Sequence, residues 1–239
     1  DGDHTVRKFT ADGRLLMTLG KKNWPSETGC INKDYRTIKK TAGPFNYPTD
    51  VCTDAEGSIY VSDGYGNAKI HKFSSDGELL LSWGELGRQP GEFNLPHGIC
   101  VDENDVVYVA DRENGRIQLF DSDGQFLEAW EANRPTDVFV HEGRLYVAEL
   151  GYSIGPRLMS GKPKDGFMAA RLSVFTVEGE LLSRWGSGDS CAPGSFRAPH
   201  TVCVDSKGSI YVGEVVISSA KPGTVPADCH ALQKFIRVR

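Results

Sequence analysis

A fourfold internal repeat constrains the fold of this 239-residue chain more than any other feature of its sequence. Four segments align on a proline: FNYPTDVCTDAEGSIYVSD from Phe45, FNLPHGICVDENDVVYVAD from Phe93, RPTDVFVHEGRLYVAE from Arg134 and FRAPHTVCVDSKGSIYVGE from Phe196. Each segment continues into a second half, such as AKIHKFSSDGELLLSWG, and the last of these, ALQKFIRVR, stops early. The opening residues, HTVRKFTADGRLLMTLG, match the second half alone.

Each repeat contains four short alternating or β-rich runs, separated by turn sequences such as AEGS and SSDGE. Four strands per repeat, at a period of about 40 to 50 residues, are typical of β-propeller blades. No stretch shows helical periodicity, which excludes a helical solenoid. We therefore expect an all-β fold, a single β-propeller domain over residues 1–239. Its parts are a half-blade at 1–20 and blades at about 45–84, 93–131, 134–186 and 196–239.

The repeat resembles that of NHL-type β-propellers, and the resemblance covers essentially the whole chain. Members of that family usually close a ring of six blades. The resemblance therefore implies that the first one and a half blades, roughly, are absent from this sequence. An open ring would leave strand edges exposed, which favours pairing with another chain. We expect a homo-oligomer formed through these edges, or a five-bladed closure if the sequence is complete.

Composition and charge argue against nucleic acid and membrane as partners of this chain. The net charge is −5 and no block of basic residues is present, so nucleic acid is not expected as a partner. No apolar run approaches the roughly 18 residues that indicate a membrane span. Among the six cysteines, those in DVCTD, GICVD and TVCVD are expected to be small buried residues. A disulfide between Cys191 and Cys229 is left open, because spacing alone does not fix a pairing.

Histidine follows the aligned proline in alternate repeats, where the residues are Thr49, His97, Thr136 and His200. The proline opens the innermost strand of a blade, and the second strand runs back antiparallel to it. The start of the first strand and the end of the second therefore share a face, which brings His97 and Arg112 together. Imidazoles from alternate blades, with a third from a preceding blade, suit a zinc site with an open coordination position. The structural alternative is that His97 and His200 cap strands or form hydrogen bonds across the channel.

Four acids follow the apolar pair of each second strand and are expected on the same face: Asp63, Asp111, Glu149 and Glu214. Carboxylates and histidines together could hold calcium, manganese or zinc. A metal-activated water there would make the protein a hydrolase of esters, lactones or phosphotriesters. The structural alternative is that the four carboxylates cap backbone N–H groups at turns.

A narrower resemblance is carried by PTDVCTDAEGSIYVSDGYGNAKIHKF, GEFNLPHGICV, VADRENGRIQLF, APHTVCV and IYVGE, in this order across residues 45–214. These segments resemble peptidyl-α-hydroxyglycine α-amidating lyase and its bacterial relatives. The resemblance implies that His97 and His200 bind zinc, that Tyr65 is the catalytic base and that Arg112 contacts the substrate. The implied reaction cleaves a carbinolamide, a small molecule or peptide, to an amide and glyoxylate. It also points weakly to an extracytoplasmic or secreted location.

The sequence departs from that family at several positions. A second family arginine has no counterpart here. Thr201 stands where the family has an aspartate for calcium, which puts calcium in doubt, and Gly66 replaces a loop cysteine. The long loop between Leu150 and Ala170 is a candidate lid. A non-catalytic NHL scaffold that binds protein or carbohydrate is the remaining alternative, and it predicts no bound metal.

Overall fold

The structure, a computed structural model, describes residues 2–151, 169–186, 191–217, 223, 225–226 and 229–236. These residues form strands and two short 3-10 helices, η1 (Tyr35–Thr37) and η2 (Arg112–Asn114), which confirms the all-β prediction. No helix in these ranges is long and apolar enough to cross a membrane. The chain divides into two compact units, Asp1–Ala129 and Trp130–Arg239.

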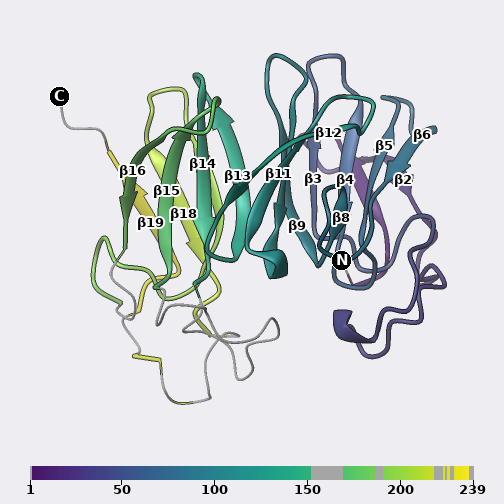
Figure 1. The fold of residues 1–239 in the computed structure, drawn as a ribbon, viewed down its shortest axis with the longest axis horizontal. Coiled ribbons are helices and arrows are strands. Elements are labelled where there is room, and N and C mark those ends of the chain that lie inside the picture. The colour runs from purple at the N-terminus through teal and green to yellow at the C-terminus, as the bar shows by residue number, and fades with distance from the viewer. Residues whose placement is uncertain are drawn as a thin grey trace. The chain divides into compact units, whose positions relative to one another are not determined.

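The first unit contains a two-stranded sheet and the antiparallel blades that follow it (Figure 1). The pair is β1 (Val6–Phe9) with β2 (Leu15–Leu19). The next sheet is formed by β3 (Asp50–Thr53), β4 (Ile59–Asp63), β5 (Lys69–Phe73) and β6 (Leu79–Trp83). The following one contains β9 (Pro96–Val101), β10 (Val107–Asp111), β11 (Arg116–Phe120) and β12 (Phe126–Glu131), and the boundary between the two units falls inside β12. A short parallel pair, β7 (Glu85–Leu86) with β8 (Glu92–Phe93), lies in the connection between them.

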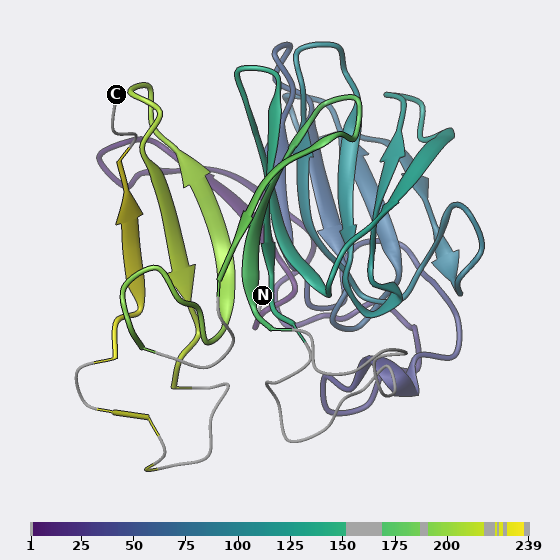
Figure 2. The same cartoon turned by 60° about the vertical axis from the view of Figure 1, so that its left-hand side comes forward.

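The second unit repeats the same meander, and the turned view shows the strands of each sheet running side by side (Figure 2). Its four-stranded sheet consists of β13 (Pro135–His141), β14 (Arg144–Glu149), β15 (Arg171–Thr176) and β16 (Leu181–Trp185). Its three-stranded sheet consists of β17 (Pro199–Val204), β18 (Ile210–Glu214) and β19 (Leu232–Phe235). The sheets follow the sequence repeats, which confirms the β-propeller fold. Four blades are described, together with the two-stranded pairs β1–β2 and β7–β8, so the described residues form fewer blades than the six of the family ring.

The phenylalanine that opens a repeat explains how consecutive blades pack. Phe93 is fully buried in a cluster that joins Tyr60 and Ile70 of one blade to Ile99 and other apolar residues of the next. Phe196 is equally buried between β15 and β18 in the second unit. Truncating such a buried phenylalanine to alanine typically costs about 3–5 kcal/mol. The apolar positions of the repeat are thus the contacts between blades.

Turn glycines add a second contact between blades. Gly124 adopts a φ of +74°, and a Cβ there would lie 2.8 Å from the side chain of Trp83 in the preceding blade. Gly179 adopts a φ of +90°, and a Cβ there would lie 2.7 Å from Trp130. Only glycine combines the left-handed conformation with this close approach. The Gly-containing hairpin and the tryptophan of the outer strand are therefore one packing unit.

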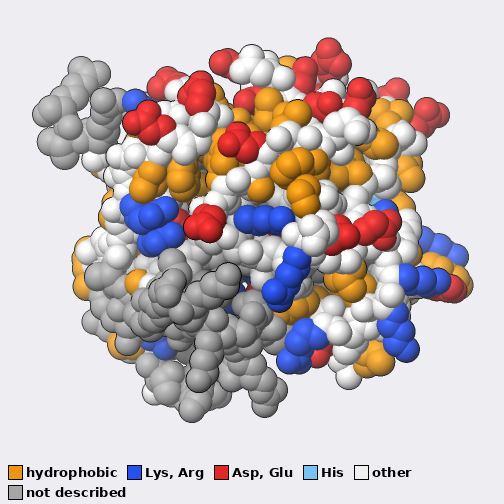
Figure 3. All heavy atoms as spheres, in the orientation of Figure 1, with side chains coloured by type: hydrophobic (Ala, Val, Ile, Leu, Met, Phe, Trp, Pro, Cys, Tyr) orange, Lys and Arg blue, Asp and Glu red, His pale blue; other side chains and the backbone are white. Residues whose placement is uncertain are grey.

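The outermost strands expose pairs of large hydrophobic residues, and orange side chains are plainly visible on the surface in Figure 3. These pairs are Leu15 and Leu16, Leu79 and Leu80, Phe126 and Leu127, and Leu181 and Leu182.

The cysteines differ from one another. Cys191 and Cys229 form a disulfide, the pairing that the sequence left open. Cys100 is buried as predicted, but Cys203 is exposed. The prediction for Cys203 was wrong because it lies on the face of β17 opposite to its buried neighbours Val202 and Val204.

Candidate functional site

Tyr65 and His97, two of the residues predicted to be functional, are in direct contact. The Tyr65 hydroxyl lies 3.0 Å from Nε2 of His97, and the two rings meet edge to face with their centroids 5.4 Å apart. His97 is 3% exposed, whereas Tyr65 is half-buried. The phenol oxygen is therefore oriented by a buried imidazole, as a proton-transfer group needs to be.

Arg112 is the third residue at this place. β9 and β10 pair Pro96 with Asp111, and the backbone N–H of Arg112 donates to the Leu95 carbonyl at 3.2 Å, so Arg112 lies at the same end of the blade as the start of β9. The guanidinium carbon of Arg112 lies 5.8 Å from the centroid of the Tyr65 ring. Nε of Arg112 donates to the buried Glu113 carboxylate at 3.0 Å, which fixes the direction of the side chain.

The backbone around His97 is held by the preceding blade. Thr49 Oγ1 donates to the Pro96 carbonyl at 2.9 Å, and Ser62 Oγ donates to the His97 carbonyl at 2.7 Å. The Asp50 carboxylate accepts the backbone N–H of Ile99 at 3.0 Å. Burial raises the pKa of Asp50 to about 6. These three contacts form a clamp between β3–β4 and β9.

The same clamp recurs in the second unit around His200, which is half-buried at the start of β17. Thr136 Oγ1 donates to the Pro199 carbonyl at 3.0 Å, and the Asp137 carboxylate accepts the backbone N–H of Val202 at 2.8 Å. The alternation of Thr and His after the aligned proline therefore has a structural cause. Each Pro-Thr-Asp blade holds the Pro-His blade that follows it. The PTD triplets at 48–50 and 135–137 were the sequence signal for this clamp, which the sequence analysis missed.

The four predicted acids share one structural position. Each carboxylate accepts a backbone N–H from the loop that leads into the aligned proline of its own blade. The donors are Asn46 to Asp63 at 2.9 Å, Asn94 to Asp111 at 2.8 Å, Asn133 to Glu149, and Arg197 to Glu214 at 2.7 Å. These contacts favour capping for all four, and their role as metal ligands stays a prediction.

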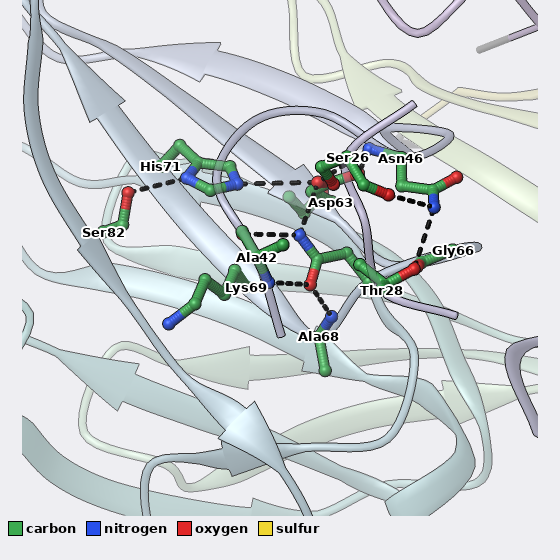
Figure 4. Close-up of polar contacts among 12 residues, drawn as sticks. Ser26, Thr28, Ala42, Asn46, Asp63, Gly66, Ala68, Lys69, His71 and Ser82 are labelled. Atoms are coloured by element: carbon green, nitrogen blue, oxygen red, sulfur yellow. Dashed lines mark hydrogen bonds and ion pairs between the residues drawn. The ribbon is translucent and has the colours of Figure 1, made fainter. Parts of the chain in front are cut away.

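Asp63 shows how fully such an acid is engaged (Figure 4). It is completely buried and accepts from the Asn67 amide at 2.9 Å, while Nε2 of His71 lies 3.5 Å away. Nδ1 of His71 lies 2.7 Å from the hydroxyl of Ser82 on the outer strand. The network joins β4, β5 and β6 inside the blade.

Asp111 is as buried as Asp63, and its carboxylate accepts hydrogen bonds from more side chains. It accepts from Asn114 and from Nε of Arg116, both at 2.8 Å. Burial nevertheless raises its pKa to about 6. Arg116 also donates to the carbonyls of Gln89 and Glu92, so it braces the loop that precedes β9.

The predicted zinc ligands, His97 and His200, lie in different parts of the chain. Within the described ranges, no three or more His, Cys, Asp or Glu side chains gather as a metal-binding group. His97 belongs to the first unit and His200 to the second, so neither unit alone provides both predicted ligands. Nε2 of His97 is directed at Tyr65, and a neutral imidazole has one lone pair to offer there. Zinc bound through this atom would replace that hydrogen bond. Most of the predicted lid loop, residues 152–168, lies outside the described residues.

Comparison with known proteins agrees with the fold. The family model for the NHL repeat matches residues 45–73 and 93–120, which contain the first three strands of two blades. A solved structure described as "Streptogramin B lyase structure" superposes with a TM-score of 0.58 at 12% identity. It covers 98% of this chain and 59% of the other, and it supports the fold alone. The chain is therefore a β-propeller that contains NHL repeats at these residues.

Two kinds of curated relative share its sequence. Peptidyl-alpha-hydroxyglycine alpha-amidating lyase 1 of Drosophila melanogaster is 29% identical over 231 residues, which cover 89% of this chain and 39% of the relative. NHL repeat-containing protein 3 of Homo sapiens is 36% identical over 225 residues, which cover 89% of this chain and 56% of the relative. The chain thus spans about half, or less, of these relatives.

Proposed function

We propose that this chain carries the catalytic face of a carbinolamide lyase, which cleaves an N-acyl-α-hydroxyglycine to an amide and glyoxylate. The observation that carries the proposal is the contact of Tyr65 with His97, at 3.0 Å, with the Arg112 guanidinium 5.8 Å from the same tyrosine ring. The sequence similarity to amidating lyases supports it. The substrate class is a small molecule or peptide that ends in the α-hydroxyglycine group.

Tyr65 is the group that moves the proton. Its oxygen accepts the proton of the substrate hydroxyl, and the electron pair of that O–H bond forms the aldehyde C=O of glyoxylate. The C–N bond breaks, its electron pair stays on the amide nitrogen, and that nitrogen takes the proton from Tyr65, which regenerates the phenolate that accepted it. When no metal occupies Nε2 of His97, this nitrogen orients the phenol, and Arg112 holds the substrate carboxylate through charge-assisted hydrogen bonds.

Zinc is the proposed cofactor, with His97 and His200 as ligands. When bound, zinc would act as a Lewis acid that polarises substrate oxygens. The described residues of each unit supply one of these histidines, so a complete set needs further donors. The hydrolase alternative would use the same metal with the four acids, whose carboxylates accept backbone N–H groups.

The test is release of glyoxylate and benzamide in equal amounts from N-benzoyl-α-hydroxyglycine, with zinc supplied. Metal content per chain is measured by elemental analysis for the wild type and for the His97→Ala/His200→Ala variant. The proposal expects turnover above the spontaneous rate, and zinc that is lost in the variant. No turnover with zinc present would overturn it.

A second candidate is a non-catalytic scaffold, favoured by the 36% identity to NHL repeat-containing protein 3. A scaffold retains its partner after His97→Ala, whereas the lyase loses turnover. A homo-oligomer formed through blade edges is also a proposal, tested by the mass of the particle in solution.

A further inference from the structure

The peptide that follows Tyr65 is held by a segment that lies outside the repeats, between β2 and β3. Thr28, in this segment, is completely buried, and its Oγ1 donates to the Gly66 carbonyl at 2.6 Å (Figure 4). Thr28 and Gly66 are 38 residues apart in the sequence. One hydroxyl therefore ties the non-repeating segment to the residue directly after the proposed base.

Asn46 orients the Thr28 hydroxyl towards that carbonyl. Nδ2 of Asn46 donates to Thr28 Oγ1 at 2.8 Å and to the Ser26 carbonyl at 3.1 Å, and because this carbonyl can only accept, the amide nitrogen is the atom on this side. Since Oγ1 accepts from Asn46, its own proton is left to donate to the Gly66 carbonyl. The backbone N–H of Asn46 donates to the buried Asp63 carboxylate at 2.9 Å, which anchors Asn46 on β4.

Gly66 lies so close to Asn46 that a side chain at position 66 has no room. A Cβ on Gly66 would be 2.4 Å from Oδ1 of Asn46 and 2.7 Å from the Asn46 carbonyl oxygen. A Cβ on Gly64, on the other side of Tyr65, would likewise meet the Pro96 carbonyl. Tyr65 therefore lies between two glycines that are both packed tightly against other parts of the chain. The direction of its side chain is set by how these two neighbours are held.

We infer that Thr28 is a positioning residue for Tyr65: its hydroxyl holds the Gly66 carbonyl and thereby keeps the Tyr65 phenol at Nε2 of His97. The inference rests on the proposed function and adds to it a residue outside the repeats on which the proton transfer depends. Without the hydroxyl, the carbonyl of the buried Gly66 loses this donor, and the peptide must turn to regain one. A turn of this peptide moves the adjoining ring, and a misplacement of about 1 Å can cost about 100-fold in rate.

Thr28→Val removes the hydroxyl and keeps the shape of the side chain, whereas Thr28→Ser keeps the hydroxyl. The first measurement is the nuclear Overhauser effect between the Tyr65 and His97 rings in the metal-free protein, which needs no turnover. Their edge-to-face contact, at a centroid distance of 5.4 Å, gives a cross-peak in the wild type. Thr28→Val should lose most of this cross-peak, and Thr28→Ser should retain it. Thr41→Val, in the same segment, is the matched control and should also retain it, since the Thr41 hydroxyl donates to the Glu85 carboxylate at 2.5 Å.

The second measurement is turnover of N-benzoyl-α-hydroxyglycine with zinc supplied. Thr28→Val should lower kcat about 10- to 100-fold and leave KM nearly unchanged, because the proton-transfer group moves while Arg112 stays in place. In a Tyr65→Phe background the same substitution should lower kcat no further, because the group that Thr28 positions is gone. A residue that only stabilised the fold would lower kcat by the same factor in both backgrounds. Thr28→Ser should restore most of kcat, and Thr41→Val should leave it unchanged.

Three results would overturn the inference: an unchanged cross-peak in Thr28→Val, an unchanged kcat in that variant of an active enzyme, or an equal loss in both backgrounds. If Thr28→Val does not fold, Thr28→Cys takes its place. Its thiol is a weak donor, so the same changes should appear at smaller size, and their absence would also overturn the inference. Failure of the lyase proposal looks different. Loss of the cross-peak in Thr28→Val, without release of glyoxylate by the wild type, would overturn the lyase and leave Thr28 as the residue that positions Tyr65.

Discussion

Gly64 lies against the carbonyl of Pro96 so closely that a Cβ on Gly64 would be 1.8 Å from the Pro96 oxygen. This approach presses the loop after β4 onto the first residues of β9. It brings the residue after Gly64, which is Tyr65, to the residue after Pro96, which is His97. The glycine of the DGY segment is therefore a requirement of the site geometry.

Gly64→Ala should destabilise the fold by at least about 2 kcal/mol, because the added methyl meets backbone that cannot move away cheaply. It should also separate Tyr65 from His97 and reduce turnover. Gly43→Ala is the matched control, since nothing lies within 4 Å of a Cβ there. Chemical denaturation of both variants makes the comparison, and equal stability of the two would contradict this contact.

Thr49→Val tests the clamp on β9. The substitution keeps the shape of the side chain and removes the hydroxyl that donates to the Pro96 carbonyl. We expect a loss of about 1 kcal/mol in the free energy of unfolding, the usual net value of one such hydrogen bond. Thr136→Val should behave in the same way at Pro199. A variant as stable as the wild type would show that the clamp contributes nothing.

Two aspartates should give pH dependences of opposite sign. Burial raises the pKa of Asp50 from 3.8 to about 6, so the native protein holds more protons than the unfolded chain between these values. The contribution of Asp50 to the free energy of unfolding is present below a pH of about 4. It is lost as the pH rises through about 6, by at most about 3 kcal/mol.

Hydrogen bonds from the backbone of Ser209 and Lys207 lower the pKa of Asp205 to about 2. Its contribution is present above a pH of about 4 and is lost as the pH falls towards 2.

The measurement is denaturation of the wild type, Asp50→Asn and Asp205→Asn across this range of pH. Asp50→Asn retains an oxygen that can accept the Ile99 N–H and should lose the fall in stability between pH values of about 4 and 6. Asp205→Asn should alter the free energy of unfolding only below a pH of about 4. Identical profiles for Asp50→Asn and the wild type would contradict the assignment to Asp50.

Loss of the disulfide should destabilise the second unit. The bond joins Cys191 and Cys229, which are 38 residues apart in the sequence. A disulfide that closes a loop of this size typically adds about 2–4 kcal/mol to the free energy of unfolding. Cys191→Ser/Cys229→Ser should therefore unfold at lower denaturant concentration than the wild type. Reduction should destabilise the wild type and leave this variant unchanged. An unchanged midpoint for the reduced wild type would contradict the expectation.

The repeat predicted the fold because each blade is encoded by the same alternation of apolar residues and turn glycines. It also predicted that the end of β10 meets the start of β9, which the pairing of Asp111 with Pro96 confirms. A meander fixes such relations inside a blade through strand order alone. Identification of Tyr65 depended on resemblance, and the Tyr65–His97 contact required the structure.

Other features could not be read from periodicity. Thr28 lies in the non-repeating segment between β2 and β3, so no alignment of repeats assigns it a neighbour. The partners of Asp50 and Asp137 lie on the next blade, and the repeat does not show contacts between blades. The four acids were correctly placed at the ends of their strands, but their backbone donors come from loops of irregular sequence.

Tyr65→Phe tests the central claim most directly, with Tyr47→Phe as its matched control, since both rings lie beside Lys33 and the hydroxyl of Tyr65 contacts His97. The measurement is glyoxylate release from N-benzoyl-α-hydroxyglycine by each folded variant at saturating substrate. The account predicts a loss of about 100-fold or more for Tyr65→Phe, the usual minimum for removing a proton-transfer group, and little change for Tyr47→Phe. Equal turnover by the wild type and Tyr65→Phe would contradict it.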